Sequence, residues 1–216
     1  MDLVRALKFP LDDEDWPVKI AIGSFILLIP VIGWVASLGY QIAVARNVIR
    51  GSARPLPGSD SLGQIFTDGV MAGLAGLLYM LPTAPLWCVM AVLSGIADGS
   101  SAGDFALACV SVGAALVSIV YGIPAAAMYW IGVMRYTQSG NFSEFTQFGS
   151  LWREARANAG TLVTLFIYNL LLGLLLAIIS PLAVLTCIGI FVLAFYSQVA
   201  SGHLIGQAGR EIVRSY

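Results

Sequence analysis

The sequence contains few side chains that could carry acid–base or metal chemistry. His203 is the only histidine, whereas a zinc site usually needs three or four protein ligands. Cys88, Cys109 and Cys187 lie in apolar stretches without the close spacing of a metal or redox motif, so we expect them to be buried packing residues. The sequence has no zinc-hydrolase, phosphate-loop or nucleophile–histidine–acid pattern. We therefore expect a protein that is not an enzyme, with no catalytic residue, metal or cofactor.

One cofactor role stays open for the single histidine. An imidazole can be the axial ligand of a tetrapyrrole metal, and His203 is the only residue of this chain that could supply one. The alternative is a hydrogen-bonding residue, because His203 stands where the last apolar stretch ends. The sequence does not exclude a tetrapyrrole.

Three amide side chains lie within apolar stretches. Asn169 is midway along one of them, and Gln41 and Gln198 are near the ends of two others. Amides in lipid usually form hydrogen bonds between helices. The alternative is a polar path for a solute, lined by Asn169, Gln41 and Gln198.

Few charges flank these stretches. Arg46 and Arg135 follow two of them at equivalent positions, and we expect both side chains to reach lipid headgroups. Pairing of either arginine with Asp68 is the alternative. Asp68 and Asp98 flank one apolar stretch at opposite ends, so they cannot form a catalytic carboxylate pair.

The composition explains this scarcity of charge. Of the 216 residues, 58% are hydrophobic and 11% are charged, and the mean hydropathy is +0.86. Soluble domains carry about 25% charged residues, so the solvent of this chain must be lipid. The net charge of −1 and the lack of a basic tract give no basis for binding nucleic acid.

Uncharged runs predict an all-α integral membrane protein with about five transmembrane helices, some broken or kinked by proline. The last two helices come from one run of 46 residues, 157–202, which as a single helix would be about 69 Å long. That run must turn back, and Ser180-Pro181 is the expected corner. The expected organisation is an N-terminal interfacial segment at 1–19, one transmembrane domain at 20–205 and a cytoplasmic tail at 206–216. The predicted spans are 20–45, 69–93, 105–134, 161–179 and 182–202.

Arginine and lysine orient the helices. They occupy the loops at 46–54 and 135–156 and the C-terminal tail, but not the other two connections. The positive-inside rule then places both basic loops and the tail in the cytoplasm. We expect the first segment to cross completely, which puts the N-terminus outside. The alternative is a re-entrant hairpin that turns at Pro30 and leaves the N-terminus inside.

An internal repeat supports this orientation. Tyr40 is followed by Ile, Val and Arg at alternate positions, ending at Arg46, and by Gly51. The same pattern runs from Tyr129 to Arg135, with a glycine at the same offset. A weaker copy begins at Tyr196. Equivalent helix ends should emerge on the same side of the membrane.

The stretch after the second copy predicts a short in-plane cytoplasmic helix. Phe145, Phe148 and Trp152 fall on one side at helical spacing, as in helices that lie in the membrane interface. Asn141 followed by Glu144 is a helix-start pattern, with the asparagine as cap and the glutamate reaching back.

Small residues at four-residue spacing predict close helix packing. The longest such stripe lies on the third predicted span, which we therefore expect to be the central helix or a contact with another subunit. It consists of Ala114, Ser118, Gly122 and Ala126, and shorter pairs occur at Gly69/Gly73 and Gly202/Gly206.

Several residues in the first half of the chain form a recognisable set, namely Trp16, Lys19, Tyr40, Gly51, Pro57, Asp68, Gly69, Tyr79 and Pro82. With them the chain resembles domain-of-unknown-function family 4013, a group of prokaryotic multipass membrane proteins. The resemblance implies several transmembrane helices in a prokaryotic cytoplasmic (inner) membrane. It implies no activity or catalytic residue.

These observations favour a non-catalytic multipass membrane protein, a scaffold or an accessory subunit of a membrane complex. Its expected partners are the lipid bilayer and other membrane protein chains. A transporter or channel for a small or amphipathic solute is the alternative, and a lipid-acting membrane enzyme is the third hypothesis.

Overall fold

The structure, a computed structural model, describes residues 1–52, 56–58, 61–96, 101–186 and 188–213. The described residues form helices and connecting turns, with no strand among them. The all-α prediction is therefore confirmed. The elements are α1 (Leu3–Lys8), η1 (Phe9–Asp12), α2 (Trp16–Leu27), α3 (Ile32–Arg50), α4 (Leu62–Met80), η3 (Leu81–Thr83), α5 (Ala84–Ile96), α6 (Ser101–Ser139), η4 (Phe142–Phe145), α7 (Phe148–Ala157), α8 (Ala159–Val184) and α9 (Gly189–Val213).

Four segments, not five, are long and apolar enough to cross a membrane within the described parts of the chain. They are Leu62–Ile96, Gly103–Ser139, Ala159–Val184 and Gly189–Ile212. The difference from the predicted five lies at the first span, 20–45, which is not one helix.

The first apolar segment is a helical hairpin. Helix α2 ends at Leu27 and α3 begins at Ile32, and the turn between them contains Pro30 and Val31, whose φ of 67° is strained for a β-branched residue. A Cβ on Gly33 would lie 2.3 Å from the carbonyl oxygen of Ile26, so the two helices meet closely at the turn. The predicted first span, 20–45, is therefore not one continuous helix, and the chain turns at Pro30 as the alternative expected.

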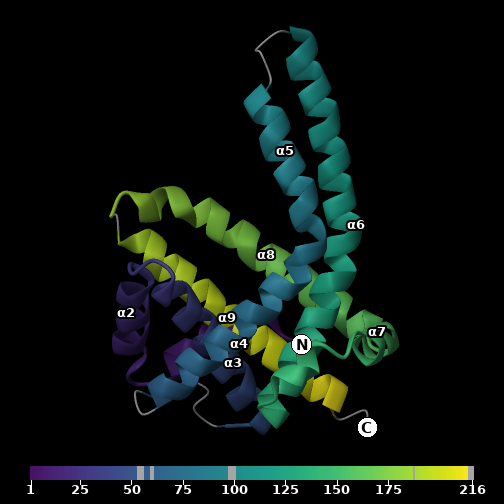
Figure 1. Cartoon of the computed structure of the whole chain (residues 1–216). Coiled ribbons are helices and arrows are strands. Elements are labelled where there is room, and N and C mark those ends of the chain that lie inside the picture. The colour runs from purple at the N-terminus through teal and green to yellow at the C-terminus, as the bar shows by residue number, and fades with distance from the viewer. Residues whose placement is uncertain (53–55, 59–60, 97–100, 187, 214–216) are drawn as a thin grey trace.

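The hairpin brings the N-terminal segment to the C-terminal end of α9. The backbone N–H of Asp2 donates to the side chain of Gln207, whose amide nitrogen donates to the Asp2 carbonyl at 3.0 Å. The hydroxyl of Tyr196 also donates to the carbonyl of Leu7. In Figure 1 the N-terminus and the C-terminal end of α9 lie toward the end of the molecule that also carries α7.

Proline positions shift two predicted boundaries. Helix α8 continues through Pro181 to Val184, so the corner expected at Ser180-Pro181 comes later. Pro181 lacks the N–H that would pair with the Ala177 carbonyl; the hydroxyl of Ser180 donates to that carbonyl instead, at 2.9 Å. The second span does break, because η3 with Pro82 separates α4 from α5.

Helix α3 is the centre of the bundle and packs between α4 and α9. A Cβ on Gly39 would lie 1.7 Å from the carbonyl oxygen of Ile65, and one on Gly69 would lie 1.8 Å from that of Val35. On α9, a Cβ on Gly202 would lie 2.5 Å from the carbonyl oxygen of Gln41 in α3, and one on Gly206 would lie 2.5 Å from the Val48 side chain. Close packing at Gly69 and at the Gly202/Gly206 pair is therefore confirmed, but the third predicted span, α6, is not the central helix.

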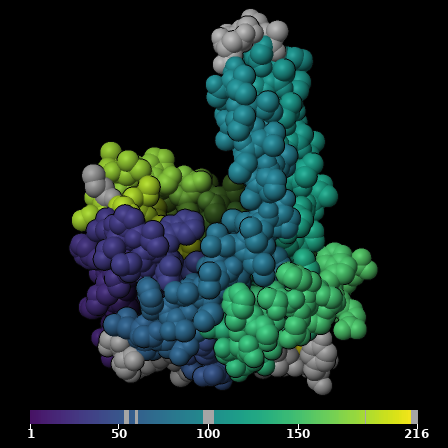
Figure 2. Space-filling model, in the orientation of Figure 1, coloured from purple at the N-terminus to yellow at the C-terminus, as the bar shows by residue number. Residues whose placement is uncertain are grey.

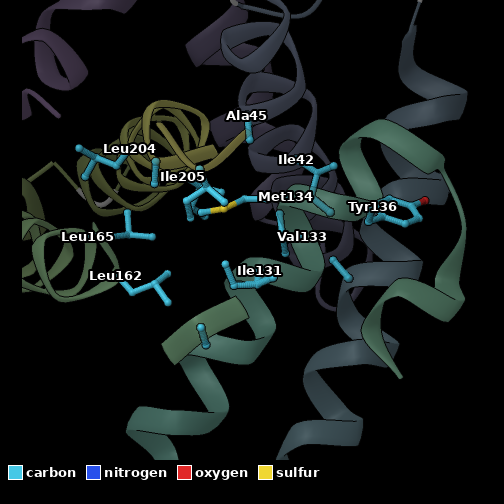
Figure 3. Close-up of a cluster of buried hydrophobic side chains, with 14 of the residues drawn as sticks. Ile42, Ala45, Ile131, Val133, Met134, Tyr136, Leu162, Leu165, Leu204 and Ile205 are labelled. Carbon is cyan, nitrogen blue, oxygen red and sulfur yellow. The ribbon is translucent and has the colours of Figure 1, made fainter. Parts of the chain in front are cut away.

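The buried side chains gather at the end of α6 nearer α7. Ile131 and Met134 of α6 belong to one buried cluster with Ile42 of α3, Leu165 of α8 and Leu204 of α9, and all five are almost fully buried (Figure 3). This cluster joins the second copy of the repeat to the central helix.

The other half of α6 leaves the bundle. With α5 it forms a hairpin that projects well beyond the remaining helices (Figures 1 and 2). Most of its large apolar side chains are exposed, including Val112, Leu116 and Val120. In a membrane these side chains must be covered by lipid or by another protein.

Candidate functional site

The first repeat arginine forms a buried ion pair. Nη1 of Arg46 lies 2.7 Å from a carboxylate oxygen of Asp68, which is fully buried. Gln64 and Tyr136 donate to the other carboxylate oxygen at 2.8 and 2.9 Å, and Nε of Arg46 donates to the Thr137 carbonyl at 3.2 Å. The alternative pairing with Asp68 is thus what the chain forms, and the expectation that Arg46 reaches lipid headgroups is wrong.

The second repeat arginine is also paired within the chain. Nε of Arg135 donates to Glu154 at 2.8 Å and its Nη1 donates to the Ser150 hydroxyl at 2.9 Å. Glu144 lies 3.8 Å away, so it faces Arg135 rather than the start of its own helix. In both copies the arginine binds a carboxylate of the segment that follows it.

The repeat glycines confirm that the two copies are structurally equivalent. Gly51 and Gly140 end α3 and α6 with φ angles of 75° and 69°, the left-handed conformation that favours glycine at a helix end. The weak third copy differs, because α9 runs on through the equivalent positions to Val213.

Two of the three amides expected in the membrane are brought together. Gln41 donates to the Ser201 hydroxyl at 3.0 Å, and that hydroxyl donates to Oδ1 of Asn169 at 2.7 Å. These two hydrogen bonds connect α3, α9 and α8. Ser201 was missed from the sequence because a hydroxyl within an apolar helix commonly bonds its own backbone. The side chain of Gln198 forms no hydrogen bond with another described residue.

His203 is buried on α9 near the N-terminal segment. Its ring stacks on Phe9 with centroids 4.2 Å apart, and its Nδ1 lies 2.9 Å from Nε2 of Gln207. No cluster of three metal-binding side chains occurs within the described ranges. Cys88 and Cys109 are exposed on the membrane-spanning helices, so the expectation of buried packing is wrong for both. Cys187 lies outside the described residues.

The stretch at 142–152 that was predicted as one in-plane helix is divided into η4 and α7, and only part of its predicted apolar face is buried. Asn141 caps η4 by accepting from the Ser143 N–H at 3.0 Å, and α7 follows at Phe148–Ala157. Phe145 is fully buried, but Phe148 and Trp152 are 46% and 38% exposed. The buried face of α7 consists of Leu151 and Ala155.

An apolar groove of about 1140 Å³ opens on the side of the bundle. Its walls come from the α2–α3 turn, α3, α4 and α6. Small residues of two helices line it, namely Gly73 and Gly76 of α4 and Ser118, Gly122 and Ala126 of α6. Figure 2 shows the hollow face between the projecting hairpin and the rest of the molecule.

Within the described chain, only part of the stripe on α6 is packed. A Cβ on Gly122 would meet nothing within 4 Å, and the same holds for Gly76 on the facing wall. Ala114 is buried, while Ser118 and Ala126 are half-buried in the groove. Gly122 is therefore not closely packed against another helix of the described chain, whereas Ala114 at the other end of the stripe is buried.

Tyrosines hold the two walls of the groove at a fixed spacing. Tyr79 of α4 donates to the Phe145 carbonyl at 3.0 Å, and Tyr121 of α6 donates to the Tyr79 carbonyl at 3.0 Å. The acceptor in the second bond lies in the last turn of α4, next to the break at Pro82. The rings of Tyr79 and Tyr129 also meet edge to face, with centroids 6.0 Å apart.

Most of the nine residues on which the family resemblance is based stabilise this arrangement of helices. Asp68, Gly69 and Tyr79 connect α4 to α3 and α6, and Pro82 breaks the second span. Lys19 binds Asp13 at 2.7 Å. The remaining members stand at helix ends, in a connection or in the core: Trp16 begins α2, Tyr40 packs on Phe195, Gly51 caps α3, and Pro57 lies between α3 and α4.

These helices and their buried polar contacts define a multipass α-helical membrane protein. The family model described as "Protein of unknown function (DUF4013)" matches residues 22–188. The chain belongs to this family, and the matched region includes the repeat arginines, Asp68 and the groove. Comparison with curated proteins and with solved structures gives no match.

Proposed function

We propose that the chain is a non-catalytic membrane scaffold that assembles with a second copy of itself through the lateral groove. The observation that carries this proposal is the groove lined by small residues on both walls, with open space at Gly76 and Gly122. Small side chains let helix backbones approach closely in lipid, where packing rather than water drives association.

Helix α6 is the occupant that best fits the groove. It forms one wall, and beyond the bundle it exposes a long apolar surface that its own chain does not cover. A two-fold axis beside α6 would bring the stripes of both copies together, because a two-fold interface uses the same patch on each subunit. One contact would then cover the groove and part of the hairpin in both chains.

The polar groups support a scaffold better than a transport path. Gln41 and Asn169 are held by Ser201 in bonds between helices, and Arg46 and Asp68 satisfy one another. We place the protein in a prokaryotic cytoplasmic membrane with both basic loops and both termini in the cytoplasm, because Lys and Arg favour that side.

Subunit counting by native mass spectrometry of the full chain in mild detergent tests the proposal. We expect a dimer for the unchanged chain and mainly folded monomer for Gly122→Leu and Gly76→Leu, because both positions face open space within the described chain. The matched control is Val120→Leu, on the opposite side of α6 and 74% exposed. A monomeric unchanged chain would refute the proposal, as would equal dimer fractions in all variants.

A further inference from the structure

A second hollow, of about 510 Å³, lies at the end of the bundle where the N-terminal segment meets α9. Its walls include α1, the end of α3 at Gly51 and Ser52, and the last turns of α9. Unlike the lateral groove, it is lined by polar and charged side chains. The interactions that hold the helices together involve only some of these polar and charged side chains.

Two guanidinium groups, those of Arg5 and Arg210, line this hollow. Neither side chain forms an ion pair or hydrogen bond with another described residue, whereas Arg46 and Arg135 are both paired with carboxylates. Planar guanidinium groups present several donors in a fork that fits phosphate oxygens.

The acidic residues of the hollow are largely engaged. The Asp2 carboxylate accepts from the Arg5 backbone N–H at 3.0 Å, and Glu211 binds the amino group of Met1 at 2.6 Å. Asp12 also lines the hollow and, like Arg5 and Arg210, it is exposed, so water weakens the field of all three charges. Arg5 and Arg210 are nevertheless the cationic side chains of the hollow whose donors have no partner among the described residues, so these donors can bind an incoming anion.

The hydrogen bonds around His203 determine which ring nitrogen is the donor. Gln207 accepts from the Asp2 N–H and donates to the Asp2 carbonyl, which fixes its oxygen and nitrogen. Its nitrogen, a donor only, lies 2.9 Å from Nδ1 of His203. Nδ1 must therefore be the acceptor, and the ring proton resides on Nε2.

We infer that this hollow binds a phosphate group, held by the guanidinium groups of Arg5 and Arg210 and by the Nε2–H of His203. The hydroxyl of Ser52, on the same wall, supplies a further donor. The phosphate belongs either to a lipid headgroup or to a soluble phosphate, since both present the same oxygens. A bound phosphate would also link α1 to α9, which connects ligand binding to the docking of the N-terminal segment.

The single histidine makes this inference directly testable. The full chain, labelled with ¹⁵N-histidine in detergent, gives one imidazole spectrum. Inorganic phosphate should shift the Nε2 resonance in a saturable manner and leave Nδ1 as the acceptor. Each of Arg5→Gln and Arg210→Gln should weaken the apparent affinity about tenfold or more, because a charge-assisted hydrogen bond contributes about 1.5–3 kcal/mol.

The control removes the same charge elsewhere: Arg153→Gln, on the exposed face of α7, should bind like the unchanged chain. Nanodiscs of phosphatidylcholine with or without phosphatidic acid distinguish the sources. A shift only with phosphatidic acid assigns a lipid headgroup, and a shift with inorganic phosphate assigns a soluble ligand. No shift in either arm overturns the inference, as does equal binding by all three variants. Neither result depends on whether the groove forms a dimer.

Discussion

Asp68 is a buried carboxylate that accepts hydrogen bonds from three side chains of the bundle. It is fully buried and receives hydrogen bonds from Arg46, Gln64 and Tyr136. These donors come from three stretches of chain, so the carboxylate fixes α3, α4 and α6 relative to one another. Removing one partner of a buried ion pair leaves an uncompensated charge, which costs more than the pair itself contributes.

The Asp68→Asn variant should therefore be strongly destabilised. We expect a loss of about 3–5 kcal/mol in the free energy of unfolding, because Arg46 keeps its charge in a buried site. The measurement is unfolding in mixed micelles by denaturant titration. The control is Glu144→Gln, whose 3.8 Å pair with Arg135 is partly exposed and should contribute under about 1 kcal/mol. Equal losses in the two variants would contradict this role of Asp68.

Glycine contacts at the centre of the bundle lead to a second prediction. The Gly39→Ala variant should lose about 1–3 kcal/mol by overpacking, since its Cβ would overlap the Ile65 carbonyl on α4. Gly113→Ala makes the same chemical change on α6 where nothing lies within 4 Å, and should be neutral or slightly stabilising. Melting temperatures in detergent compare the two, and a loss at Gly113 equal to that at Gly39 would count against the packing.

At the scale of elements, hydropathy predicted the apolar segments well but not their breaks. The spans containing α6 and α8 lie near their predicted positions, whereas the span containing α9 lies farther along the chain than the predicted 182–202. Proline had a different effect at each site: Pro30 lies in a turn, Pro82 in a short helix break, and Pro181 within a continuing helix. The outcome depends on neighbours such as Ser180, whose hydroxyl replaces the missing donor, and single-sequence patterns do not specify these contacts.

The candidate site was only partly predictable for the same reason. The repeat identified Arg46, Arg135 and the two capping glycines, because periodicity is a local property of the sequence. The partners Asp68 and Glu154, and the bridging Ser201, depend on how helices cross. The stripe on α6 was recognised from its spacing, but spacing does not say whether a stripe packs inside its own chain or faces open space.

The α2–α3 hairpin predicts that both ends of the chain lie on one side of the membrane. Single cysteines at Val4, Ser52 and Leu185, in a chain with Cys88, Cys109 and Cys187 replaced, report this through a membrane-impermeant thiol reagent. Intact cells should label only Leu185→Cys, which lies in the turn between α8 and α9. Labelling of Val4→Cys together with Leu185→Cys would show a complete first crossing and contradict the hairpin.

At the scale of the whole molecule, the described chain covers its own membrane helices poorly. Only 11% and 6% of the most apolar windows of Leu62–Ile96 and Gly103–Ser139 are buried, against 44% for Gly189–Ile212. The helices around α3 and α9 therefore cover one another within the described chain. No other part of that chain covers most of the α5–α6 hairpin or the groove beside it. A second copy would supply that neighbour on the side where the small residues gather.

Disulfide cross-linking in native membranes tests this assembly most directly. In the chain without its three cysteines, Gly122→Cys places one thiol in the groove, and Val120→Cys places one on the opposite side of α6. Oxidation should convert most of the Gly122→Cys protein to a covalent dimer and leave the Val120→Cys protein largely monomeric. Equal cross-linking at the two positions, or none at Gly122→Cys, would contradict assembly through the groove.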